Sequence, residues 1–152
     1  MRSFLLLLHL SGVIVWVGGM FFAHVCLRPV AASQLQPAQR LPLLAGVLGR
    51  FFTAVAVSIV AILVSGFAAM ATVGFAQAPI HWHVMASIGL WMAAIFAVIY
   101  FMYYPRLVAG VAIKDWPAAG AAMNRIRILV ATNLLLGAAT VVVALLGTAI
   151  GG

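Results

Sequence analysis

Four apolar stretches, each long enough to cross a lipid bilayer as a helix, dominate the chain. They cover residues 4–26, 46–73, 82–104 and 126–150. A hydrocarbon core about 30 Å thick requires about 20 helical residues. Backbone polar groups in lipid must be hydrogen-bonded within the spanning segment, and helices meet this condition. With short connections between the stretches, we predict an all-α polytopic integral membrane protein, a single antiparallel four-helix transmembrane bundle covering residues 1–152.

Little of the chain remains outside these stretches. Hydrophobic residues make up 67% of the sequence and charged residues 6%, and the mean hydropathy is +1.27. These values lie far from those of soluble domains. A formal net charge of +7 would favour a nucleic-acid partner in a soluble protein, but here the cations flank membrane stretches and act as topological signals. The expected partner is therefore the lipid bilayer, and no nucleic acid.

The positions of the cations predict an orientation. The second connection, "GFAQAPI", contains no charge, and only Arg2 lies on the same side of the predicted bundle. The other cations lie in or beside the first and third connections: Arg28, Arg40, Arg50, Arg106, Lys114, Arg125 and Arg127. By the positive-inside rule these two connections are cytoplasmic. We expect a multi-pass protein of the bacterial inner membrane with both termini in the periplasm.

The first and third connections contain residues that end or begin helices. The segment 28–42, "RPVAASQLQPAQRLP", has three prolines, so we predict that the first helix ends near Arg28. Asp115, followed by Pro117, is a predicted N-cap for a helix that runs into the fourth stretch. Asp115 is also the only acid in the chain, which argues against a carboxylate relay for a proton-driven pump.

His9 is the first candidate for chemistry. A helix that begins near Phe4 places His9 about 8 Å inside the outer boundary. Trp16 and Met20 follow on the same helical face. Polar side chains in membrane spans avoid lipid and commonly mark functional sites, so we expect this face to be turned into the bundle.

The start of the third stretch, "PIHWHVM", supplies a second imidazole at a similar depth. His81 and His83 fall on opposite faces of a helix, and Ser87 follows His83 on its own face. Neutral imidazoles on facing helices suit axial ligation of a b-type haem. We predict His9 and His83 as ligands of the haem iron, with Trp16 and Ser87 beside the cofactor. The alternative is a pair of structural imidazoles that hydrogen-bond across helices.

Copper is the competing ligand for this chain, because imidazole, thioether and thiolate groups all bind it. The candidate copper ligands are His81, Met85 and Met92 on the outer side and Met20, His24 and Cys26 on the inner side. The same spacing is ordinary for apolar helix faces, and His24 beside Arg28 is also explained as an interfacial imidazole. For Asn133, within the fourth stretch, we expect a structural interhelical hydrogen bond.

The string "LHLSGVIVWVGGMFFAHVCLRP" resembles the first helix of small bacterial CopD-like membrane proteins, named from the copper-resistance D domain. The resemblance continues through "RLPLLAGVLGRFF", "HWHVMASIGLWMAAIFAVIYFMYYPRL" and "DWPAAGAAMNRIRILVATNLLLGAAT" and so covers nearly the whole chain. It implies copper uptake or resistance. Such proteins often have eight spans, so a homodimer of this chain would supply the other half.

The spacing of His9, the Trp-x-Gly motif and the His-rich start of the third stretch is also similar to that of HemJ-type protoporphyrinogen oxidases. This resemblance implies that haem b is bound through His9. Met85 stands where the family pattern has a lysine, and His83 is left as the second ligand. The expected function is electron transfer or haem-dependent redox chemistry in the membrane, in which the chain could act as an oxidoreductase; the sequence does not identify its electron donor or acceptor.

Overall fold

The computed structural model describes residues 1–150, and these residues fold into helices joined by short connections. Four long helical segments, 2–34, 37–73, 80–112 and 116–149, are each long and apolar enough to cross a membrane. The prediction of an all-α fold is therefore confirmed. The elements are α1 (Arg2–Val13), η1 (Ile14–Gly18), α2 (Gly19–Phe21), η2 (Phe22–Leu27), α3 (Arg28–Gln34), α4 (Pro37–Val73), η3 (Phe75–Gln77), α5 (Ile80–Val98), η4 (Ile99–Tyr103), α6 (Tyr104–Ala112) and α7 (Trp116–Ile150).

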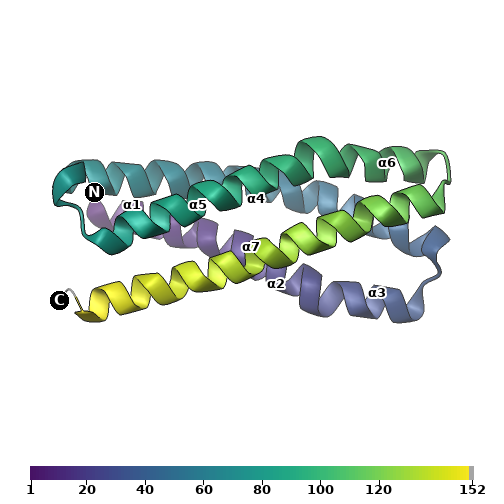
Figure 1. Cartoon of the computed structure of the whole chain (residues 1–152), viewed down its shortest axis with the longest axis horizontal. Coiled ribbons are helices and arrows are strands. Elements are labelled where there is room, and N and C mark those ends of the chain that lie inside the picture. Colours follow the sequence, from purple (N-terminus) through teal and green to yellow (C-terminus); the bar gives the residue numbers. More distant parts are fainter. Residues whose placement is uncertain (151–152) are drawn as a thin grey trace.

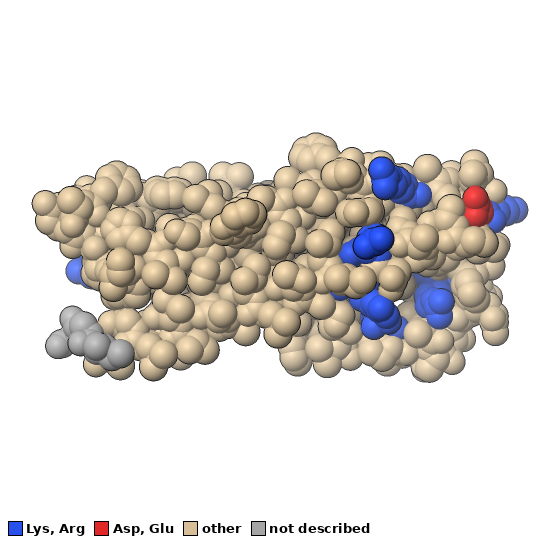
Figure 2. Space-filling model, viewed as in Figure 1, with Lys and Arg blue, Asp and Glu red and all other residues tan. Residues whose placement is uncertain are grey.

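The four segments lie side by side, and the chain turns back at each of its three connections (Figure 1). Both termini and the turn between α4 and α5 lie at one end of the molecule. We call this the terminal end (residues 1–11, 62–88 and 138–149). The other two connections lie at the opposite end, which we call the cationic end (residues 28–50 and 106–127). Every Lys and Arg except Arg2 belongs to the cationic end, and Figure 2 shows the cations gathered there.

The first helix does not end near Arg28, so that prediction is wrong. The helix continues through Pro29 to Gln34, and the third segment likewise continues through Pro105 to Ala112. A π-helical segment directly precedes each of these prolines, η2 in one case and η4 in the other. The wider π turn shifts the backbone hydrogen bonds by one residue, so that the helix can accommodate proline, which has no backbone N–H. The proline then occupies the first turn of a new α segment, where no donor is needed.

The connections are consequently shorter than predicted. Only Leu35 and Gln36 separate α3 from α4. The turn between α6 and α7 contains Lys114 with a φ of 59°. The backbone N–H of Ala118 donates a 3.0 Å hydrogen bond to Asp115 Oδ1, so the predicted N-cap of the fourth helix is confirmed.

The hydrophobic core occupies the middle of the molecule and the cationic end. Its centre is Phe52, which is 1% exposed and packs edge-on against Phe96, Tyr100 and Tyr104 at centroid distances of 5.6, 6.4 and 5.3 Å. Closer to the connections, Gly110 lets α6 approach α7, because a Cβ there would lie 3.0 Å from Ala119 N. Buried apolar residues are absent from the described part of α7 beyond Gly137 and from α1 before Gly12. At the terminal end the buried apolar side chains are Met70 of α4 and Ala78 of the turn after it, and the described residues of α1, α5 and α7 contribute none.

Candidate functional site

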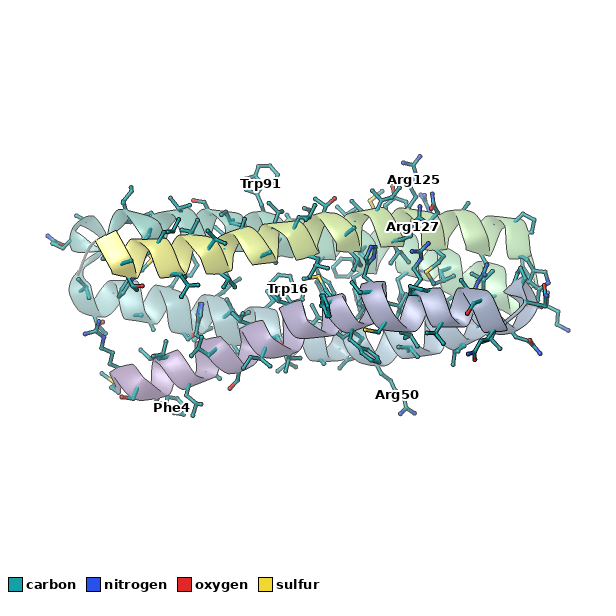
Figure 3. The ribbon with its side chains drawn as sticks, turned by 90° about the horizontal axis from the view of Figure 1, so that it is seen from below. Phe4, Trp16, Arg50, Trp91, Arg125 and Arg127 are labelled. Carbon is teal, nitrogen blue, oxygen red and sulfur yellow. The ribbon has the colours of Figure 1, made fainter. Side chains whose placement is uncertain are left out.

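His9 and His83 belong to two different helix pairs at the terminal end. Here α1 packs mainly against α4, whereas α5 packs mainly against α7. Figure 3 shows Phe4 at this end and Trp16 further along, between the helices. Any group that joined the two imidazoles would have to bridge the two pairs.

The His9 imidazole is held by α4. Its Nδ1 lies 3.1 Å from the Ile62 carbonyl oxygen and 3.1 Å from Ser65 Oγ. A carbonyl oxygen only accepts hydrogen bonds, so Nδ1 carries the proton in this arrangement. Ser65 Oγ is itself a donor to Ala61 O at 2.6 Å and can accept from His9. In the neutral ring, Nε2 therefore has its lone pair, and no hydrogen bond engages it among residues 1–150.

The His83 imidazole is fixed by the turn that precedes its helix. Its Nε2 lies 3.0 Å from the Phe75 carbonyl oxygen, so this nitrogen is the donor. In the neutral ring the lone pair is then on Nδ1. His81, two residues earlier, packs against α7, where its ring fills the space beside Gly147. The two neighbouring histidines thus face different surroundings, as the helical spacing predicts.

A shared layer of side chains relates the depths of His9 and His83. A Cβ added to Gly137 would lie 3.0 Å from Val17 Cγ2 and 3.4 Å from Met92 Cε, so these three residues lie at one level. His9 is eight residues before Val17, and His83 is nine residues before Met92. At about 1.5 Å per residue, the two histidines lie roughly 12 and 14 Å from this layer, in the direction of the terminal end.

The predicted neighbours of the cofactor have different positions. Trp16 is 4% exposed and lines a small internal cavity with Met20, Phe52 and Asn133. Since Trp16 is seven residues from His9 along its helix, it lies about 10 Å deeper. Ser87 is exposed, and its hydroxyl donates to the His83 carbonyl of its own helix at 2.9 Å.

Asn133 ties α7 to α5 as expected. It is 1% exposed, and its Nδ2 donates to Met92 O at 3.0 Å. Its Oδ1 is buried and has no hydrogen-bond partner in the described part of the chain.

The candidate copper ligands are dispersed over the molecule. On the outer side, His81 packs on Gly147 while Met92 is buried in the core. On the inner side, Met20 belongs to the core and Cys26 is exposed. Met85 is half-buried on α5. Within residues 1–150, no three His, Cys, Asp or Glu side chains are grouped so that they could hold one metal ion.

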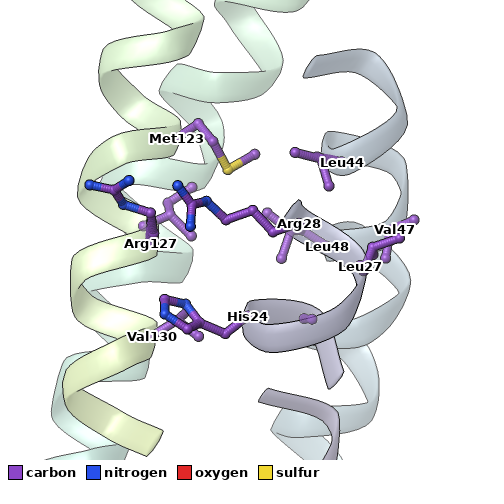
Figure 4. Close-up of a pocket in the computed structure, with 11 residues that line it drawn as sticks. His24, Leu27, Arg28, Leu44, Val47, Leu48, Met123, Arg127 and Val130 are labelled. Atoms are coloured by element: carbon purple, nitrogen blue, oxygen red, sulfur yellow. The ribbon is translucent and has the colours of Figure 1, made fainter. Parts of the chain in front are cut away.

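His24 lies in surroundings that sequence reasoning missed. It lines a cavity of about 40 Å³ together with Arg28, Arg127 and apolar side chains of α4 and α7. Figure 4 shows Arg28 extending across this cavity, with its guanidinium beside that of Arg127. The signal in the sequence was the spacing of His24 and Arg28, four residues apart and hence on one helix face. Their meeting with Arg127 depends on how the first and fourth helices pack.

No protein-family model, curated protein sequence or solved structure matches the chain.

Proposed function

We propose that the chain is an integral protein of the bacterial inner membrane, an antiparallel four-helix bundle that holds one haem b between His9 and His83. Both termini and this site face the periplasm. The bound haem serves one-electron transfer or haem-dependent redox chemistry.

Helix length and charge position support the membrane part of the proposal. Measured from the terminal end of each helix, the first cations of the cationic end are Arg28, Arg50, Arg106 and Arg127, at about 23 to 26 residues. This separation corresponds to roughly 35 to 39 Å. A hydrocarbon core of about 30 Å with its interfacial layers fits that length. The cationic end then protrudes into the cytoplasm, in agreement with the positive-inside rule.

Apolar side chains on the outside of the helices support the same environment. Trp91 is 71% exposed and projects away from the bundle (Figure 3). Phe101 is 74% exposed and Leu135 73%. Large exposed apolar surface is rare on soluble monomers and is the expected condition in lipid.

The observation that carries the haem proposal is the state of the two imidazoles. Each donates one ring N–H to a backbone carbonyl, His9 to Ile62 and His83 to Phe75. Metal-ligating histidines almost always make such a bond, because it fixes the ring and leaves the other nitrogen with its lone pair. Nε2 of His9 and Nδ1 of His83 are left with their lone pairs, at similar depth in the terminal end. Ligation of haem iron through Nε2 of His83 would require this ring to give up its bond to Phe75.

The protein's own residues would orient the ligands and exclude water. Ser65 and the Ile62 carbonyl keep the His9 proton on Nδ1. A haem would have to lie between the two helix pairs, which the turn at residues 74–79 joins at this end. A bound haem b would supply an iron centre that accepts and donates one electron. Lipid-facing apolar side chains on both pairs would keep the site dry.

The test is an absorption spectrum of the full-length protein, purified in detergent after expression with added haem precursor. The wild-type protein is expected to show a Soret band with about one haem per chain by the pyridine haemochrome assay. His9→Ala and His83→Ala are each expected to lose the band or shift it strongly. His81→Ala and His24→Ala are matched controls that should retain it, and elution volume and helical circular dichroism report folding of every variant.

Two results would contradict the proposal: a wild-type protein without a Soret band under haem-replete conditions, or a folded His9→Ala variant with an unchanged spectrum. Metal analysis of the same samples separates iron from copper. Stoichiometric copper that is lost in His81→Ala and kept in His9→Ala would replace haem with the copper alternative.

A further inference from the structure

The cavity beside His24 has an almost wholly apolar lining with two arginines at one side. Arg28 and Arg127 border this side, with Met123 beside them and with their guanidiniums next to each other. The apolar side is made by Leu27, Leu44, Val47, Leu48, Ile126 and Val130. The lining residues come from η2, the start of α3, α4 and α7, so the cavity lies where three of the four helical segments meet.

The two guanidiniums repel each other and have no opposing carboxylate among residues 1–150. Arg28 is within electrostatic reach of both Arg127 and Arg40. The single acid, Asp115, caps α7 at the turn and is committed to Ala118 N. Two guanidiniums that lie side by side repel each other, and an anion between them would relieve this repulsion. The arrangement therefore favours a negatively charged ligand.

We propose that this cavity binds an anionic phospholipid of the cytoplasmic leaflet. Its phosphate is held by Arg28 and Arg127, and an acyl chain runs along the apolar side. This inference goes beyond the proposed haem site, which lies at the other end of the bundle and does not depend on it.

Depth and chemistry both favour a phospholipid. Arg28 is about 26 residues, or roughly 39 Å, from the start of its helix, which is the depth of the inner headgroups if the terminal end lies at the outer surface. His24 is one turn closer to the bilayer centre, beside the apolar side chains. Basic cavities between membrane helices on the cytoplasmic side are suited to lipid headgroups. Arginine also offers planar, bidentate donors for phosphate oxygens.

The test measures lipid retention by the full-length protein. The protein is purified in a non-ionic detergent, mixed with phosphatidylglycerol or phosphatidylcholine, and analysed by native mass spectrometry. The wild type is expected to bind one phosphatidylglycerol at least about tenfold more tightly than phosphatidylcholine. Arg28→Gln and Arg127→Gln should each weaken phosphatidylglycerol binding by about tenfold or more, the effect of losing one charge-assisted hydrogen bond.

Arg50→Gln is the matched control, because it removes the same charge from a side chain that points away from the bundle (Figure 3). It should bind phosphatidylglycerol as the wild type does. Both test variants remove one member of a repelling pair, so they are expected to fold. If either does not, Arg28→Lys and Arg127→Lys replace them, with a smaller loss expected because lysine lacks the planar fork.

Three outcomes would overturn the proposal. The first is equal binding of the two lipids. The second is displacement of phosphatidylglycerol by an excess of inorganic phosphate, which would make the cavity a site for a soluble anion. The third is unchanged phosphatidylglycerol binding by folded Arg28→Gln and Arg127→Gln variants.

Discussion

The terminal end and the cationic end of the bundle are built from the same four helices but are held together differently. At the cationic end and in the middle, apolar and aromatic side chains such as Phe52 and Leu107 are fully buried. At the terminal end the specific interactions are polar: His9 binds α4, and His83 binds the turn after α4. Dense packing fixes one end, and a few hydrogen bonds orient imidazoles at the other.

This difference indicates which end of the bundle can accommodate a cofactor. A close-packed core leaves no space for a flat group without strain. At the terminal end the described residues of α1, α5 and α7 bury no apolar side chain, so a haem between His9 and His83 would displace fewer packed groups there. The cationic end differs, because buried apolar side chains hold its helices together and its arginines lie beside one small cavity.

The largest expected effect concerns which side of the membrane each end faces. In a Cys26→Ser background, Gln77→Cys reports the terminal end and Gln36→Cys the cationic end, and both positions are exposed. In intact spheroplasts, an impermeant thiol reagent should label Gln77→Cys nearly completely and Gln36→Cys only after lysis. The reverse pattern would place the histidines on the cytoplasmic side and invert the proposed orientation.

The next effect tests the packed region. Phe52→Ala removes the centre of the aromatic cluster and should lower the free energy of unfolding by about 3 kcal/mol. This is the lower part of the range for such substitutions, since membrane helices associate through packing rather than the hydrophobic effect. Phe4→Ala, at a residue 65% exposed at the terminal end, should cost less than about 0.5 kcal/mol. Unfolding in detergent measures both, and equal losses would remove the contrast between the two ends.

The sequence predicts the helices better than their junctions. Four apolar runs and the position of Asp115 are sufficient for an all-α fold and for the start of the fourth helix. The prediction from the prolines, that the first helix ends near Arg28, is wrong. A proline normally ends a regular α-helix, but Pro29 and Pro105 each follow a π-helical turn after which the helix continues. Periodicity does not reveal where such turns occur.

In the candidate site, too, features within one helix were predicted from the sequence and contacts between helices were not. Local spacing places His81 and His83 on different faces, and the structure agrees. The partners of His9 could not be predicted, because they depend on the register between α1 and α4. The meeting of His24 and Arg28 with Arg127 likewise depends on the packing of distant segments. Contacts between helices require tertiary information that one helix's pattern does not contain.

A smaller effect tests the polar attachment of the terminal end. Ser65→Ala removes one acceptor of the His9 Nδ1 proton and leaves the Ile62 carbonyl, so the expected loss of unfolding free energy is about 0.6 kcal/mol, the average for interhelical hydrogen bonds in membranes. Ser58→Ala is the control, because Ser58 is also buried but its hydroxyl donates to Ala54 of its own helix. A loss for Ser65→Ala no larger than for the control would show that the His9–Ser65 contact does not stabilise the fold. In the haem-bound protein, Ser65→Ala should also shift the reduction potential, and Ser58→Ala should not.

The smallest change in unfolding free energy is expected at Asn133, a buried polar residue between α7 and α5. Asn133→Leu removes the bond to Met92 O, which costs about 0.6 kcal/mol. It also removes a buried Oδ1 that has no partner among residues 1–150, which returns about 1 kcal/mol, the lower end of the cost of a buried unsatisfied group. The net change in unfolding free energy should therefore be less than about 0.5 kcal/mol, and Thr132→Ala, an exposed neighbour bonded to Ile128 O of its own helix, provides the baseline. A destabilisation above about 2 kcal/mol would contradict this prediction. It would mean that Oδ1 accepts a hydrogen bond in the folded protein, for which a water molecule in the small cavity beside Trp16 is the candidate donor.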